Sequence, residues 1–191
     1  MKEEKLPAVD INHYPAVKKR LDDEKIHSKL IKREDQGDTP YNLRNCAYLR
    51  EFEKPKIMWG ELSDKPKFAF DKDGRYYCLN TVFFFTGKRL EYLLCYLNSS
   101  ICEYMFSKRC TTSGMGTMRW LKYTVERIPI PQLSEAQEKE IVDLYHKYEK
   151  SSDENVLNQV NSLFYQFIGL DEEDIKVVEG KSNTHEVSDA L

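Results

Sequence analysis

The sequence predicts an α+β protein: a small, mostly antiparallel sheet with flanking helices, followed by a C-terminal helical hairpin that serves as a spacer. Two observations support this prediction. From residue 56 to residue 85 the apolar side chains follow the two-residue period of a strand. From residue 90 onward they recur every three or four positions, which is the period of a helix. With 12 Tyr, 9 Phe and 2 Trp among 191 residues, the chain can build a core.

The predicted sheet has three extended segments. Residues 56–62 and 67–70 have strand composition, residues 71–74 read Asp-Lys-Asp-Gly and predict a hairpin turn, and residues 75–85 form a further aromatic run. A helix should follow and pack on the sheet through a wide apolar face made of Leu90, Leu93, Leu94 and Leu97. A second short helix should then present Ile101, Tyr104, Met105 and Phe106 to the core.

Helices are also predicted on both sides of this region. Pro15 suits the first turn of a charged helix that continues to about residue 34, with only a thin apolar stripe. The prolines of residues 127–131 exclude a helix and indicate an edge strand or a strap. Ser134 and Gln137 form a capping-box pattern, and further helices are predicted over residues 153–168 and 171–178. These elements divide the chain into an N-terminal charged helix (1–35), a central domain (36–132), a helical spacer (133–180) and a disordered tail (181–191).

Composition limits the possible classes of protein. No apolar run reaches the roughly 20 residues that span a bilayer, and no signal-peptide core follows residues 1–5, so a cytoplasmic location is the default expectation. The five cysteines show no C-x-x-C pair and are expected to be reduced packing residues. The four histidines have no metal-ligand spacing, so we expect no metal site.

Charge is distributed unevenly along the chain. The formal net charge is -3, but residues 1–132 hold 24 Lys and Arg against 18 Asp and Glu, whereas residues 133–191 hold 5 against 14. The first part therefore carries +6 and the second -9. A basic body is compatible with a polyanionic partner, although a solvated surface can show the same excess.

The first candidate binding site is the basic, small-residue loop around residues 108–122. Its glycines allow a ligand to approach the backbone closely, and its cations can bind phosphates or base edges. A simple solvated connecting loop is the alternative. The proposed charged contacts are Lys108, Arg109, Arg119 and Lys122, and the candidate polar readers are Thr111, Thr112 and Ser113. If residues 118–122 form a strand, Trp120 should point inward, away from Arg119.

A weaker second patch follows the turn at residues 36–40. Tyr41, Asn42, Arg44 and Asn45 offer stacking groups and bidentate hydrogen-bonding groups of the kind that read bases. The same residue types also cap turns, so a structural role is equally open.

Five segments, in order, resemble a known family. They read YNLRNCAY (41–48), KIMWGEL (56–62), RYYCLNTVFF (75–84), KRLEYLLCYLNSS (88–100) and ERIPIPQLSEAQEKEIVDL (126–144). Together they resemble a TaqI-like C-terminal specificity domain, the target-recognition module of type IIG restriction-modification enzymes and related adenine-specific DNA methyltransferases. Residues 163–180 resemble the usual end of such enzymes.

This resemblance implies sequence-specific recognition of double-stranded DNA for methyltransferase and endonuclease domains located elsewhere. The chain has no Asn-Pro-Pro-Tyr motif and no Gly-rich cofactor loop, so no catalytic residue, S-adenosylmethionine site or other cofactor site is predicted, and the chain is expected to be a fragment or stand-alone specificity module. Two rival functions remain open. One is a protein-interaction module that docks through the helical hairpin, and the other is a nuclease fragment that uses Asp171, Asp174, Glu179 and Lys181.

Overall fold

The computed structural model describes residues 8–34, 36–42, 46, 48–110 and 117–180. These residues form an α+β fold, as predicted, and they divide into two units, Met1–Leu49 and Arg50–Leu191. The α-helices are α1 Pro15–Leu21, α2 Glu24–Leu30, α3 Leu90–Leu97, α4 Ser100–Ser107, α5 Lys122–Val125, α6 Glu135–Ser151, α7 Glu154–Ile168 and α8 Glu172–Val178. The strands are β1 Lys56–Gly60, β2 Leu62–Ser63, β3 Ala69–Asp71, β4 Val82–Thr86 and β5 Met118–Arg119, and short 3-10 turns cover Ile11–His13 and Leu49–Glu53.

The unit Met1–Leu49 contains two short helices where the sequence predicted one. The predicted helix over residues 15–34 is interrupted after Leu21, because Asp23 leaves the helical conformation (ψ 128°). Its carboxylate then accepts the backbone N–H of Lys25 at 3.2 Å and starts α2. Leu30 is the buried apolar residue of this unit among the described residues, in agreement with the thin apolar stripe.

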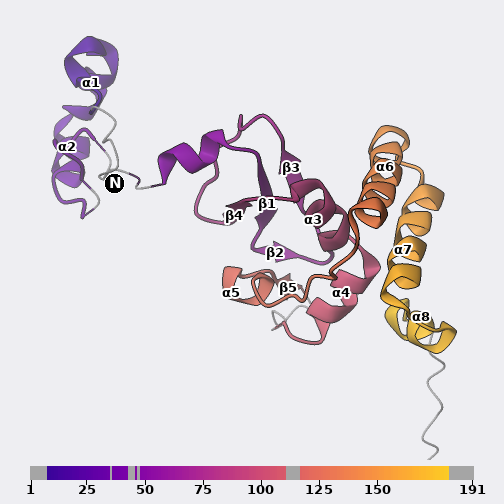
Figure 1. The fold of residues 1–191 in the computed structure, drawn as a ribbon. Coiled ribbons are helices and arrows are strands. Elements are labelled where there is room, and N and C mark those ends of the chain that lie inside the picture. Colours follow the sequence, from indigo (N-terminus) through magenta and orange to yellow (C-terminus); the bar gives the residue numbers. More distant parts are fainter. Residues whose placement is uncertain (1–7, 35, 43–45, 47, 111–116, 181–191) are drawn as a thin grey trace, which may run out of the picture. The chain divides into compact units, whose positions relative to one another are not determined.

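In the unit Arg50–Leu191, β1 is the centre of a three-stranded antiparallel sheet with the order β3-β1-β4 (Figure 1). Ile57 is opposite Phe70 on one side and Phe85 on the other. The predicted hairpin between residues 67–70 and 75–85 is therefore wrong, since β1 separates the two strands. Residues 75–81 are not paired in a ladder because the Asp71 carboxylate accepts the backbone N–H groups of Arg75 and Tyr76.

Helix α3 packs on this sheet, as predicted from its apolar face, and places Leu94 and Leu97 in the core. Trp59 of β1 lies against Phe68, Phe83 and Phe85 at ring-centroid distances of 5.5 to 5.9 Å. A second antiparallel pair, β2 with β5, extends the same unit.

The C-terminal helical hairpin is an integral part of this core. Ser134 and Gln137 form the predicted capping box, and α7 ends at Gly169 with φ of 80°. Figure 1 shows α6 and α7 side by side, with α3 between α6 and the sheet. The side chains of Ile141, Val160 and Phe164 are fully buried, so the hairpin shares one apolar core with α3 and α4.

Residues 127–131 form a strap. The hydroxyl groups of Tyr92 and Tyr96 donate to the carbonyl oxygens of Pro131 and Pro129, both at 2.8 Å. These two hydrogen bonds from buried tyrosines attach the strap, which connects α5 to α6, to helix α3.

Candidate nucleic-acid interface

The two sides of the predicted binding loop are joined by an aromatic stack. Phe106, at the end of α4, lies parallel to Trp120, which follows β5, with a centroid distance of 3.6 Å and an interplanar angle of 3°. Both side chains are about 1% exposed. The Trp120 indole N–H donates to the carbonyl of Ser63 at 3.3 Å, and the Trp59 indole N–H donates to the carbonyl of Trp120 at 2.7 Å. The predicted inward orientation of Trp120 is confirmed.

The predicted cations lie on the surface around this stack. Lys108 is the C-cap of α4, with Nζ 5.0 Å from the centroid of the Tyr104 ring, and Arg109 is the next residue. Lys122 begins α5 and lies 3.6 Å from Glu126. All three are exposed, so each can meet a polyanion. The predicted polar readers Thr111, Thr112 and Ser113 lie outside the described residues.

Arg119 points outward from β5 and has a partner that the sequence did not reveal. Its guanidinium donates to the carboxylate of Glu61, and this hydrogen bond raises the pKa of Arg119 above its ordinary value. The backbone of Glu61 is fixed as well, because its carbonyl accepts the N–H of Trp120 at 2.7 Å and its N–H donates to the carbonyl of Thr81 at 3.0 Å. Glu61 therefore orients the guanidinium of Arg119.

Glu61 could have been found only from the register of the second sheet. Leu62 is opposite Arg119 in this sheet, and the carboxylate of the residue before Leu62 contacts the guanidinium. The sequence shows a carboxylate at the end of a predicted strand but does not show which distant strand pairs with it.

The second predicted patch has internal partners. The Tyr41 hydroxyl donates to Asp22 Oδ1 at 2.6 Å, and this bond to a carboxylate raises the pKa of Tyr41. Asn42 donates to the carbonyl of Val9 at 3.1 Å and accepts from the Thr39 hydroxyl at 2.6 Å. These contacts connect segments within the unit Met1–Leu49. Arg44 and Asn45 lie outside the described residues.

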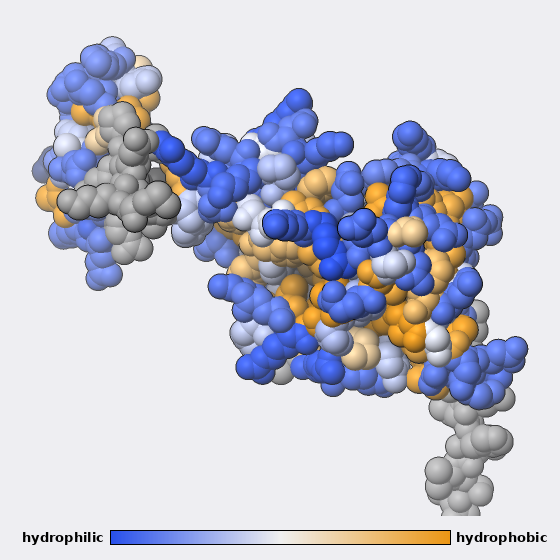
Figure 2. Space-filling model, in the orientation of Figure 1, coloured by the Kyte–Doolittle hydropathy of each residue, from blue (hydrophilic) through white to orange (hydrophobic). Residues whose placement is uncertain are grey.

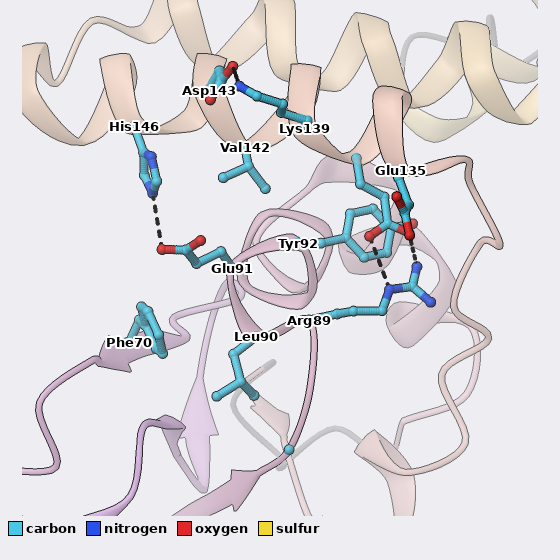
Figure 3. Close-up of a pocket in the computed structure, with 12 residues that line it drawn as sticks. Phe70, Arg89, Leu90, Glu91, Tyr92, Glu135, Lys139, Val142, Asp143 and His146 are labelled. Atoms are coloured by element: carbon cyan, nitrogen blue, oxygen red, sulfur yellow. Dashed lines mark hydrogen bonds and ion pairs between the residues drawn. The ribbon is translucent and has the colours of Figure 1, made fainter.

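A cavity of about 560 Å³ with charged and apolar lining residues lies between the start of α3 and α6 (Figure 3). Arg89 has a φ of 58°, lies 5.0 Å from the centroid of the Tyr92 ring and donates from Nε to Glu138 at 3.0 Å. On the other side, His146 Nε2 is 3.8 Å from Glu91. These pairs cross between the two helices and attach the hairpin to α3.

Among the described residues, the carboxylates considered for a nuclease (Asp171, Asp174 and Glu179) do not form a metal-binding centre. The Asp171 carboxylate caps α8 by accepting the N–H of Asp174 at 2.9 Å. Within the described part of the chain, no three His, Cys, Asp or Glu side chains are grouped so that they could hold a metal ion. Lys181 lies outside that part.

No described helix has the length and apolar character needed to cross a membrane.

A comparison with known families identifies the family of this chain. The chain matches the TaqI-like C-terminal specificity domain over residues 13–130 and belongs to that family. The match begins in the unit Met1–Leu49 and ends in the strap, so it includes β1 to β5 and the whole predicted loop. No curated protein matches the chain.

Proposed function

We propose that this chain recognises a short site in double-stranded DNA for a restriction-modification enzyme. Membership in a specificity-domain family is the observation that supports this function. The surface described above gives the proposal a physical basis, since cationic side chains surround a segment whose two ends are fixed by a buried aromatic stack.

The cations have different proposed roles. Arg119 is the proposed base reader, because a guanidinium can donate two hydrogen bonds to a guanine edge and Glu61 already orients it. Lys108, Arg109 and Lys122 are proposed phosphate contacts, since exposed cations around a reader fix its register on the duplex. Thr111, Thr112 and Ser113 remain proposed polar readers, and Tyr41, Asn42, Arg44 and Asn45 remain a weaker second proposal.

The proposed partners follow from this role. Methylation and cleavage would come from methyltransferase and endonuclease domains of a parent enzyme or a separate subunit, in the cytoplasm where such enzymes meet DNA. We keep residues 36–132 as the proposed recognition domain and residues 133–180 as the proposed spacer. The chain alone is then expected to transfer no methyl group from S-adenosylmethionine.

A protein-docking role is the second candidate, and an apolar groove favours it. The groove has a volume of about 370 Å³ and is bordered by α4, the strap and α8, with Tyr104, Ile130 and Val177 among its lining residues. Figure 2 shows hydrophobic residues gathered where α4, α7 and α8 meet. A catalytic domain of the parent enzyme is a suitable occupant, because apolar grooves of this kind bind protein surfaces.

Selection from a randomised duplex pool tests the proposed function directly. The whole chain is expected to enrich one short motif, with affinity that falls steeply as salt concentration rises. Recovery of an unenriched pool at every salt concentration would contradict the proposal. Binding of a catalytic domain without any binding of DNA would favour the docking role.

A further inference from the structure

Residues 75–81, between β3 and β4, form an exposed segment with aromatic and apolar side chains. Tyr76 is 63% exposed, Tyr77 58% and Leu79 82%. Apolar side chains so accessible to water gain little from burial on folding, whereas tyrosines are enriched where proteins contact partners. The segment therefore needs an explanation other than packing.

A buried ion pair holds the start of this segment. Lys56 and Asp71 have side chains that are 0% and 3% exposed, and the lysine also donates to the carbonyl of Phe52 at 2.5 Å. The same Asp71 carboxylate accepts the N–H groups of Arg75 at 3.0 Å and Tyr76 at 2.9 Å. Because removing two charges from water is costly and often gives no net stability, we infer that this pair serves mainly to fix the segment.

The turn before the segment is equally constrained. Gly74 has a φ of 67°, and a Cβ atom added there would lie 2.1 Å from the carbonyl oxygen of Glu53. Only glycine allows this close approach. This close contact with Glu53 therefore restricts the backbone conformation between Asp71 and Arg75.

The middle and the end of the segment are also held. The Tyr77 ring lies on Phe52, with a centroid distance of 5.2 Å and an interplanar angle of 22°. The N–H of Val82 donates to the carbonyl of Leu79 at 3.0 Å. A segment that is ordered before binding loses little conformational entropy when a partner arrives.

The segment is continuous with the surface around Arg119. The carbonyl of Thr81 accepts the N–H of Glu61, and Glu61 in turn contacts both the backbone of Trp120 and the side chain of Arg119. One residue thus connects the exposed segment to the proposed base reader.

We propose that residues 75–81 are a second DNA-contacting element of this interface, an inference that rests on the proposed function. Arg75, now 3.0 Å from Asp73, would contact a phosphate, while Tyr76 and Leu79 would lie against sugars and thymine methyl groups. The amide of the exposed Asn80 can read an adenine edge. Duplex DNA is favoured over a protein partner because the segment adjoins Arg119 and includes a cation of its own.

The test compares variants of the whole chain on the duplex obtained by site selection. The double variant Tyr76→Ala/Leu79→Ala should lose roughly tenfold or more in affinity with an unchanged thermal melt, because neither side chain is part of the core. Tyr76→Phe should retain most of the affinity, since it keeps the ring. Val17→Ala, which shortens another exposed apolar side chain on α1, is the matched control and should bind like the unmodified chain.

Two outcomes would overturn the inference. If the double variant binds DNA within about twofold of the unmodified chain while Arg119→Ala binds weakly, the segment does not contact DNA and a protein partner becomes the better explanation. If Val17→Ala loses as much affinity as the double variant, the loss is not specific to the segment. Failure of the unmodified chain to bind any duplex would instead overturn the proposed function.

Discussion

The two predicted binding patches differ in what their side chains do inside the protein. Around the loop, the buried contacts are made by the aromatic residues Phe106 and Trp120, and the cations remain at the surface. In the other patch, Tyr41 and Asn42 make the structural contacts themselves through Asp22 and Val9. Polar residues are available to a ligand when apolar neighbours supply the packing, so residue type alone does not locate a binding surface.

The largest expected effect tests the role of the aromatic stack. Trp120→Ala removes a buried ring that contacts Phe106, Phe68 and the backbone carbonyl of Ser63 in β2, so the free energy of unfolding should fall by about 3 to 5 kcal/mol in denaturant titrations. Tyr123→Ala is the control, because this ring is 56% exposed and its loss should change stability little. Equal stability of the two variants would contradict the structural role of the stack.

Acid should weaken the contact that fixes residues 75–81. Burial acts to raise the pKa of Asp71, but Lys56 and the two backbone N–H groups outweigh it and lower the pKa from 3.8 to about 2. The ionised form is the one favoured in the folded state, so its contribution to stability is complete above pH 4 and is lost as the pH falls toward 2.

Comparison with a variant separates the contribution of Asp71 to stability from the contributions of the other carboxylates. The difference in stability between the unmodified chain and Lys56→Met/Asp71→Asn should shift in favour of the variant between pH 4 and pH 2. Glu173→Gln is the control, because its pair with Lys176 is exposed. A difference that stays constant over this range would show that the buried pair does not titrate there.

The smallest expected effect concerns the second patch. Tyr41→Phe removes the hydroxyl that bonds to Asp22 and should lower thermal stability slightly while leaving DNA affinity within about twofold. Fluorescence anisotropy measures the affinity. A loss as large as that of Arg119→Ala would remove the distinction between the two patches.

The sequence predicted the elements better than their pairing. The apolar period predicted α3, Ser134 predicted the start of α6, and Gly169 predicted the end of α7. These signals lie within a few residues of the elements they define. The order β3-β1-β4 was missed because it depends on which distant strands pair with β1. The Asp71 carboxylate also accepts two N–H groups that a hairpin would use.

The same reasoning applies to the candidate site. The exposed cations could be predicted from one loop sequence, but Glu61 could not, because its contact with Arg119 joins residues 58 positions apart. The exposure of Tyr76 and Leu79 was also hidden, since an aromatic run resembles a buried strand until the pairing is known.

The central claim is that Arg119 reads a base while the neighbouring lysines bind phosphates. The most direct measurement compares Arg119→Ala, Lys122→Ala and the control Lys150→Ala on the selected duplex and on duplexes with single base changes. Arg119→Ala should lose roughly tenfold to a hundredfold on the selected site and lose preference at one position. Lys122→Ala should weaken all duplexes alike and lower the salt slope by about one unit, whereas Lys150→Ala should change neither. Full discrimination by a folded Arg119→Ala variant would contradict the account.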